Sequence, residues 1–218
     1  MTNLNFNNAI NRVKQSCPPI WMMRQAGRYQ PSYMALKEKY NFEQMCKLPQ
    51  IAAQVALLPI NEFDFDVAIL FSDILWHLEG LGLPLTFDPG PKFETHLNED
   101  NWQQYTDVDK AMKHIEFQSI ALQRTRDILP NNKSLIGFVG GPWSILNYAL
   151  GNNKVSAEFK TMFLRTVIIP LLKDSIRAQK TAGAEVVMIF DSGLENISKN
   201  YYDNHYLPMI ASIANIGN

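Results

Sequence analysis

A chain of 218 residues with 46% hydrophobic and 19% charged residues can bury a sizeable core as one large domain or two small ones, which excludes wholesale disorder. Twenty Lys and Arg against 21 Asp and Glu give a net charge of -1, so no bulk basicity indicates a nucleic acid or a membrane surface as partner. Two cysteines, Cys17 and Cys46, are too few for a disulfide scaffold, and no apolar stretch is long enough to span a bilayer. The first ten residues show no signal-peptide pattern, so we expect a cytoplasmic globular protein.

The first half of the chain alternates predicted helices with two predicted strands. Short continuous apolar runs at residues 20–23 (IWMM) and 66–71 (DVAILF) are typical of strands in a buried sheet. Apolar spacing and proline positions predict helices over four segments: residues 4–15, 31–40, 42–47 and 50–63. Pro59 should kink the last of these helices near its end.

The second half continues the same alternation. A short strand is predicted at residues 83–87 (LPLTF), and buried strands at 134–139 (SLIGFV) and 185–190 (EVVMIF). Three helices are predicted: residues 108–129, 156–182 and 200–213. Pro170 should break or kink the second of them, and Gly183 should cap its end.

Strands that alternate with helices predict an α/β protein with a parallel sheet. Four strand–helix units begin at residues 20, 66, 134 and 185. No repeat or Pro/Gly-rich linker divides the chain, so we expect a single domain over residues 1–218.

Two arginines four residues apart, Arg24 and Arg28, follow the first predicted strand in the segment Met-Met-Arg-Gln-Ala-Gly-Arg-Tyr. Guanidinium groups bind carboxylates and phosphates in a forked geometry, so such a pair suits a ligand with several anionic groups. The spacing alone favours the plainer interpretation, in which both arginines form surface salt bridges with their neighbours.

Asp73 follows the second predicted strand in Phe-Ser-Asp-Ile-Leu. Ser72 or Asp73 could cap the next helical turn, and Asp73 could instead place a carboxylate in a pocket. The spacing does not choose between these roles.

The segment Gly137-Phe-Val-Gly-Gly-Pro-Trp-Ser runs out of the third predicted strand and lacks both the dinucleotide fingerprint and the P-loop ending. Its glycines would let the backbone approach a flat ligand. Tyr148 comes shortly after, either as a ligand contact or as a core residue with a wet hydroxyl. Ser192 follows the fourth strand but has no nucleophile-turn motif around it.

The four histidines show no metal-ligand spacing, so we expect no metal site. His77 and His114 are expected at the surface or at the edge of the core.

All of these candidates follow the carboxyl ends of successive predicted strands, which is the catalytic face of a (β/α)₈ barrel. Independent surface residues need not coincide in this way. The coincidence therefore favours the functional interpretations together.

Residues 19–29 (PIWMMRQAGRY) closely resemble the N-terminal signature of the uroporphyrinogen decarboxylase family, and residues 137–148 (GFVGGPWSILNY) resemble its second signature. Residues 71–75 (FSDIL) and 188–192 (MIFDS) are similar to two further segments, in the same order. The resemblance implies a (β/α)₈ TIM barrel, of which this chain would hold about the first four βα units. It also implies a homodimeric lyase of porphyrin and haem biosynthesis that needs no cofactor.

The implied reaction removes the carboxyl groups of the four acetate side chains of uroporphyrinogen and gives coproporphyrinogen. Matched residue by residue, the family's catalytic acid is Asp73, which would also contact the pyrrole N–H groups. The implied substrate-binding positions, besides Asp73, are Arg24, Gln25, Ala26, Gly27, Arg28, Tyr148 and Ser192. The electrons left by CO₂ need an acceptor, which a protonated pyrrole ring of the substrate can provide in place of a cofactor. Asp73 would stabilise the positive charge that develops there.

Two departures from the family keep alternatives open. The residues after Ser192 read Gly-Leu-Glu-Asn where the family usually has an aromatic residue, and the family's catalytic-face histidine would lie beyond residue 218. An inactive or split-gene fragment is therefore one alternative, and for residues 1–218 alone it predicts aggregation and no decarboxylase activity. The other is a corrinoid- or thiol-linked methyltransferase of the same superfamily, which would need a zinc site.

Overall fold

The computed structural model describes residues 3–217, which divide into two compact units that interleave along the chain. The first unit comprises the residues up to Asp73, Phe117–Phe138 and Gln179–Met188. The second comprises Ile74–Glu116, Val139–Ala178 and the residues from Ile189 onward. No helix within residues 3–217 is long and apolar enough to cross a membrane. The expectation of one barrel domain over the whole chain stays a prediction.

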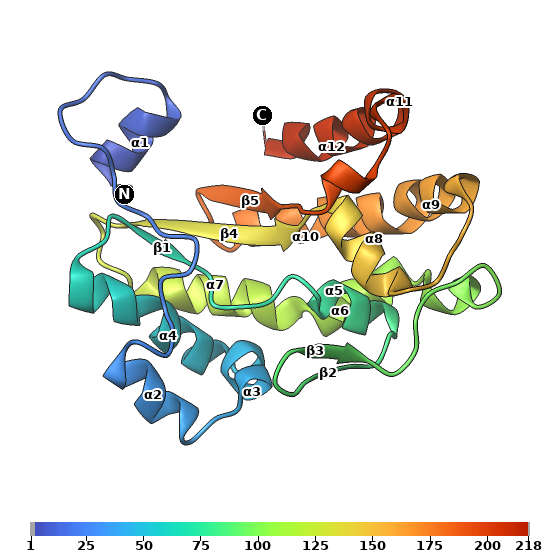
Figure 1. Ribbon diagram of the computed structural model, residues 1–218. Helices are drawn as coiled ribbons and strands as arrows, with labels where there is room; N and C mark the ends of the chain where they lie inside the picture. The colour runs from blue at the N-terminus through green and yellow to red at the C-terminus, as the bar shows by residue number, and fades with distance from the viewer. Residues whose placement is uncertain (1–2, 218) are drawn as a thin grey trace. The chain divides into compact units, whose positions relative to one another are not determined.

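A parallel sheet with the strand order β1-β4-β5 underlies the fold (Figure 1). Its strands are β1 (Val67–Ile69), β4 (Ser134–Gly140) and β5 (Val186–Phe190). Val67 pairs with Ser134 and Ile69 with Ile136, and every residue of β1 and β4 is buried. The apolar runs that predicted these three strands are confirmed, and side chains on both faces of β1 and β4 are removed from water. The predicted burial is wrong for β5, whose residues are all only partly buried.

The prediction of a first strand at residues 20–23 is wrong. Ile20 of this segment exchanges two hydrogen bonds with Asp66, from the Ile20 N–H to Oδ2 (2.7 Å) and from the Asp66 N–H to the Ile20 carbonyl (3.1 Å). Pro18 and Pro19 have no N–H to donate, and the N–H of Met22 donates to the Gln25 side chain at 3.1 Å. A side chain therefore replaces the ladder that a strand would need.

In the first unit, helices surround a small apolar core beside β1 (Figure 1). These helices are α2 (Pro31–Lys37), α3 (Phe42–Lys47) and α4 (Pro49–Phe63), and the unit also contains α1 (Leu4–Ile10), which buries no residue, and most of α7 (Glu116–Ile128). α4 packs on β1, and α2 and α3 pack on α4. Tyr33, Met45, Ile51 and Val55 form the buried centre of this core. Pro59 lies inside α4, which continues to Phe63.

Three predicted helices differ in extent from their predicted ranges, one of them α2, which ends at Lys37 and not at residue 40. α1 stops at Ile10, because Asn11 is its C-cap and Arg12 turns the chain with a left-handed φ of 57°. The predicted helix over residues 108–129 is two helices, α6 (Val108–His114) and α7, separated at Ile115 with ψ of 8°. Ile115, Leu122 and Leu129 are all buried, so the apolar stripe continues although the helix does not.

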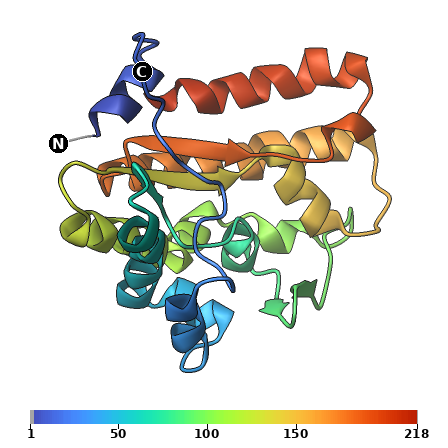
Figure 2. The ribbon, with the colours of Figure 1, turned by 60° about the vertical axis from the view of Figure 1, so that its left-hand side comes forward.

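The second unit contains an antiparallel hairpin and most of the remaining helices. The hairpin pairs β2 (Leu85–Phe87) with β3 (Pro91–Phe93), which confirms the short strand predicted there (Figure 2, green). Gly80 lets α5 (Trp76–Leu81) approach α6 closely, since a Cβ there would lie 2.9 Å from the Ala111 carbonyl. The other elements are the 3-10 helix Trp102–Tyr105, α8 (Pro142–Leu150), α9 (Ala157–Phe163), α10 (Ile169–Thr181), the 3-10 helix Leu194–Asn196, α11 (Lys199–Tyr201), α12 (Leu207–Ala214) and the 3-10 helix Asn215–Gly217.

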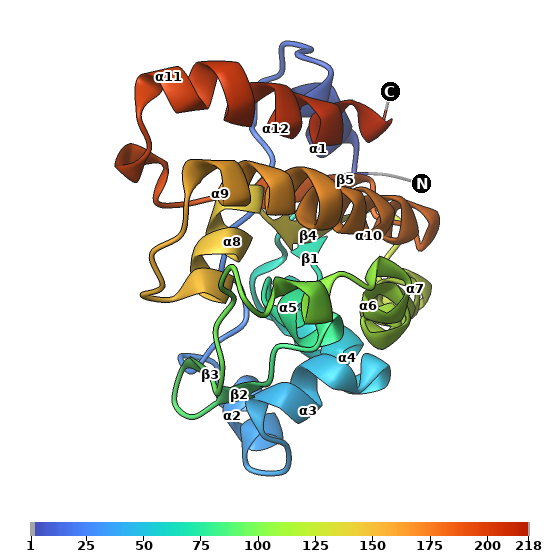
Figure 3. The ribbon, with the colours of Figure 1, turned by 90° about the vertical axis from the view of Figure 1, so that its right-hand side faces the viewer.

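A π-helical turn precedes a proline in both long helical runs of the second unit. Leu164–Ile168 joins α9 to α10 ahead of Pro170, and Tyr202–Tyr206 joins α11 to α12 ahead of Pro208. The wide turn accommodates a residue that has no N–H for the regular helical hydrogen bond. Figure 3 shows α11 and α12 as one continuous helical run. The predicted irregularity at Pro170 is therefore confirmed, as is the cap at Gly183, whose φ is +104°.

His77 is fully buried in the second unit, so its predicted surface position is wrong. Its Nδ1 lies 3.2 Å from the Ile74 carbonyl, and its Nε2 lies 3.0 Å from the Ser175 hydroxyl. The carbonyl can only accept, which assigns the proton of a neutral ring to Nδ1. Burial lowers the pKa of His77 from 6.5 to about 4.

We expect His77 to make the free energy of unfolding depend on pH. Between about pH 6.5 and pH 4 the unfolded chain binds a proton that the folded chain refuses, so stability is lost as the pH falls through this window. The shift corresponds to about 3 kcal/mol at its lower end. Urea unfolding at pH 7.5 and pH 4.5 should show a smaller loss for His77→Gln than for the wild type. An equal loss in both proteins would contradict the assignment.

Candidate functional site

The arginine loop of the first unit, residues 22–29, exposes both of its arginines. Arg24 and Arg28 have no hydrogen bond and no ion pair with any other residue in the described range 3–217. The interpretation of two surface salt bridges required such partners. The geometry therefore favours the alternative, in which the guanidinium groups are available to a ligand.

Two buried glutamines hold this loop in place. The Gln25 side chain donates to the Val67 carbonyl of β1 at 3.0 Å and accepts the N–H of Met22. The Gln30 side chain donates to Glu62 of α4 at 2.8 Å and accepts the N–H of Gly27 at 3.3 Å. Both glutamines are at most 2% exposed. Because Gln25 lies between the two arginines and Gln30 follows Arg28, these anchors fix the loop while its charges stay in water.

Exposed apolar side chains accompany the two guanidinium groups. Met22, Met23 and Tyr29 of the loop are 52–60% exposed, and Phe63 is 45% exposed with its ring centroid 6.1 Å from that of Tyr29. A surface that combines fixed positive charge with uncovered apolar groups suits a ligand that has an apolar body and carboxylate arms.

Asp73 is half-buried in the segment that follows β1. The buried Gln118 of α7 supports this segment, with its Nε2 2.8 Å from the Ser72 hydroxyl and 3.4 Å from the Asp73 carbonyl. The support fixes the backbone of Asp73. The capping and pocket roles of its carboxylate both stay predictions.

In the second unit, the Asp191 carboxylate joins the segment after β5 to the start of α8. Its Oδ1 accepts the N–H of Ser144 at 2.7 Å and the N–H of Ser192 at 3.2 Å. Its Oδ2 accepts the hydroxyl of Tyr206. Burial raises the pKa of Asp191, while the hydrogen bonds from Ser144, Ser192 and Trp143 oppose that rise.

Gly137 within β4 and Gly141 directly after it leave room for the protein's own side chains. A Cβ at Gly137 would lie 2.1 Å from the Gln179 amide oxygen, and one at Gly141 would lie 2.1 Å from Cγ of Asp191. The expectation that these glycines admit a flat ligand is therefore wrong at these two positions, because buried side chains already occupy the space.

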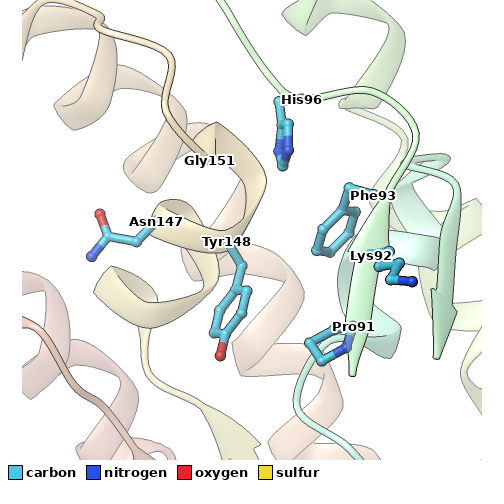
Figure 4. A pocket seen from close by; sticks show the side chains of 7 residues that line it. All are labelled: Pro91, Lys92, Phe93, His96, Asn147, Tyr148 and Gly151. Atoms are coloured by element: carbon cyan, nitrogen blue, oxygen red, sulfur yellow. The ribbon is translucent and has the colours of Figure 1, made fainter. Parts of the chain in front are cut away.

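Tyr148 lines an open pocket of about 570 Å³ between α8 and β3 (Figure 4). Its side chain is 42% exposed, so the alternative of a core tyrosine is wrong. Phe93 turns its ring toward Tyr148, and His96, whose Nδ1 is 3.3 Å from the Ala149 carbonyl, lies at the pocket edge. Ser192 is exposed but is not among the residues that line this pocket.

The structure thus gathers the candidate residues in two places. Arg24, Gln25, Ala26, Gly27, Arg28 and Asp73 belong to the first unit, and Tyr148 and Ser192 to the second. Sequence reasoning missed Gln30, Gln118, Ser144, Asp191 and Tyr206, which are polar residues that bond inside the fold. Within residues 3–217, no three His, Cys, Asp or Glu side chains lie close enough to hold a metal ion.

Comparison with a solved structure identifies the class of fold. A methyltransferase from Methanosarcina mazei matches with a TM-score of 0.80 at 14% sequence identity, over 100% of this chain and 68% of that protein. At this identity the likeness shows the fold alone. The predicted α/β fold of the (β/α)₈ family is confirmed, and the described residues form no closed barrel.

The family follows from the sequence comparisons. The family model described as Uroporphyrinogen decarboxylase (URO-D) matches residues 1–216, so the chain belongs to this family. The uroporphyrinogen decarboxylase of Anaeromyxobacter dehalogenans is 37% identical over 96% of this chain, and that of Chloroflexus aurantiacus is 36% identical over 93%. The chain spans 66% and 60% of the length of these two relatives, respectively.

Gly141→Ala should destabilise the second unit, because its new Cβ must displace the Asp191 side chain from 2.1 Å. Overpacking of this kind costs roughly 1–3 kcal/mol. Gly90→Ala is the matched control, since a Cβ there meets nothing within 4 Å. We expect urea unfolding to show a clear loss for Gly141→Ala and a change within about 0.5 kcal/mol for Gly90→Ala. Equal stability of the two variants would refute the close approach.

Proposed function

We propose that this protein is a carboxy-lyase that decarboxylates the four acetate side chains of uroporphyrinogen to coproporphyrinogen in porphyrin and haem biosynthesis. The observation that carries the proposal is the arginine loop, which holds Arg24 and Arg28 without partners among residues 3–217 and surrounds them with exposed apolar side chains. Membership in the URO-D family supports the same substrate. The substrate's eight carboxylates and large apolar ring match this surface.

In this proposal the arginine loop binds the carboxylate arms. Arg24 and Arg28 hold acetates and propionates in forked hydrogen bonds, while Ala26 and Gly27 keep the loop slim enough for the macrocycle to approach. The side chain of Gln25 is engaged with β1 and with Met22, so its proposed contribution is to position the loop.

Asp73 is the proposed catalytic residue. Protonation of a pyrrole ring carbon makes the ring an electron acceptor, the bond between the methylene carbon and the carboxylate breaks, and its electron pair passes into the ring as CO₂ leaves. A proton then adds to the methylene carbon to form the methyl group, and loss of the ring proton restores the pyrrole. The Asp73 carboxylate would accept hydrogen bonds from the pyrrole N–H groups and stabilise the cationic ring. The substrate ring then accepts the electron pair itself, so no cofactor is required as an electron acceptor.

Tyr148 and Ser192 are retained as proposed substrate contacts. Both have exposed side chains, as such a role requires. A cytoplasmic location is supported by two free thiols, with Cys17 exposed and Cys46 buried. A homodimer stays a prediction from the family resemblance.

The methyltransferase alternative receives support only from the fold. The zinc site that it needs has no cluster of His, Cys, Asp or Glu in the described residues to hold it. An inactive or split-gene fragment would have the same carboxylate-binding loop as an active enzyme. Turnover of the substrate is therefore the measurement that distinguishes this alternative from the proposal.

Binding of uroporphyrin tests the arginine loop. We expect Arg24→Ala and Arg28→Ala each to raise Kd about tenfold, because each removes a charge-assisted hydrogen bond. Lys37→Ala removes an exposed charge on α2 and serves as the control, with Kd expected within about twofold. Fluorescence titration should also show weaker binding of coproporphyrin, which lacks the four acetates. Equal affinity for both porphyrins would count against the carboxylate clamp.

Turnover tests the role of Asp73. If the wild-type chain forms coproporphyrinogen from uroporphyrinogen, Asp73→Asn should lower kcat by about 100-fold or more and change KM much less, because the charge acts mainly in the transition state. Anaerobic assays with product separation measure both parameters. Binding without turnover in the wild type would favour the inactive-fragment alternative, and full activity of Asp73→Asn would exclude the proposed role.

A further inference from the structure

We propose that the pocket between α8 and β3 binds a planar aromatic ring that carries a carboxylate, and that His96 binds the carboxylate. The side chains of Tyr148 and Phe93 face this pocket (Figure 4). The inference rests on the proposed function in one respect, namely that the ring is a pyrrole of the tetrapyrrole substrate. The pocket lies wholly within the second unit.

Neighbouring groups hold His96 in place at the pocket edge. Its Nδ1 lies 3.3 Å from the Ala149 carbonyl, and the same carbonyl accepts the N–H of Leu97 at 2.8 Å. The Asn101 side chain donates to the His96 carbonyl at 3.0 Å. A Cβ at Gly151 would lie 2.6 Å from the nearest atom of the His96 ring, so the glycine makes room for this ring. The ring therefore has a defined place and orientation.

The hydrogen bond to Ala149 determines what the other side of the ring offers to a ligand. A carbonyl can only accept, so Nδ1 carries the proton of a neutral ring and Nε2 keeps a lone pair. No group within residues 3–217 bonds to Nε2, and Figure 4 shows the ring pointing into the space between Gly151 and Phe93. Protonation of the ring adds a proton at Nε2, which can then donate a charge-assisted hydrogen bond to a carboxylate.

The charged groups around His96 favour an anion as its ligand. No Asp or Glu lines the pocket, whose titratable residues are Lys92, His96 and Tyr148. Lys92 has no ion pair or hydrogen bond with any other residue in the described range. Two acids lie near His96 in the chain, but neither lines the pocket: Glu94 is exposed, and Glu99 accepts hydrogen bonds of 2.8 and 2.7 Å from the N-cap residue of α9.

The pocket walls suit a planar ring. Tyr148 is 42% exposed, and its hydroxyl has no partner within residues 3–217. Pro91 extends the wall that Phe93 forms along β3. The ring centroids of Phe93 and His96 are 5.8 Å apart, so a ligand ring stacked on Phe93 brings a carboxylate substituent close to His96.

Naphthoate, which has one aromatic plate and one carboxylate, tests the pocket without a tetrapyrrole, and naphthamide is its uncharged counterpart. We expect the Kd of naphthoate to be about threefold lower at pH 6 than at pH 8, because protonated His96 binds the carboxylate, whereas naphthamide should not bind more tightly at pH 6. NMR titration of the probe's ring protons measures both values. H96Q should abolish the pH dependence for naphthoate.

Two further variants control this experiment. H114Q alters a histidine that bonds to Glu79 and does not line the pocket, so it should keep the pH dependence. Y148A removes one wall and should weaken both probes. Urea unfolding confirms that each variant is folded. A pH dependence that survives H96Q, or unchanged binding of both probes to Y148A, would overturn the inference.

Uroporphyrin titrations of the same variants distinguish this inference from the proposed function. If the ligand is the tetrapyrrole, H96Q should raise its Kd about threefold at pH 6 and change it much less at pH 8. Naphthoate binding that depends on His96, without any binding of uroporphyrin, would sustain the pocket chemistry and refute the proposed function. Uroporphyrin binding combined with naphthoate binding that is insensitive to H96Q would refute the inference and leave the proposed function intact.

Discussion

Buried backbone groups beside parallel strands must find hydrogen-bond partners, and in this fold buried polar side chains provide them. Gln25 donates to the Val67 carbonyl of β1, and Gln179 donates to the Phe138 carbonyl of β4 at 2.8 Å. Asp191, directly after the end of β5, accepts hydrogen bonds from two backbone N–H groups. These bonds hold the segments around the strands, and the functional candidates lie in those same segments.

Because buried polar side chains are used to bond the backbone, the residues that position each candidate site differ from the residues that are available to bind a ligand. Gln25 and Gln30 are buried and hydrogen-bonded, whereas the neighbouring Arg24 and Arg28 stay exposed and without partners in residues 3–217. Ser192 likewise has an exposed side chain while its backbone N–H donates to Ser144 Oγ and to Asp191 Oδ1. In both places the anchoring groups restrict the backbone, so a ligand would meet groups already oriented, at a smaller entropic cost.

Local patterns predicted most of the fold because they reflect burial within one element. The apolar runs of β1, β4 and β5 and the proline-linked irregularity before α10 needed no knowledge of distant residues. Two of the failures occurred where a distant partner replaced the expected environment. The segment at residues 20–23 bonds to Asp66 in place of forming a strand, and the ring of His77 is buried against Ser175.

The sequence by itself determined the α/β alternation, the family and the residue types of the candidate site, because motifs and periodicity are local properties of the chain. Only the tertiary structure decided which of those residues are available. In the sequence, Arg24 and Arg28 cannot be distinguished from arginines in surface ion pairs. The sequence around Gly141 likewise suggests space for a ligand, but in the structure the Asp191 side chain fills that space. Availability depends on which distant side chain occupies each position, and that is set by packing.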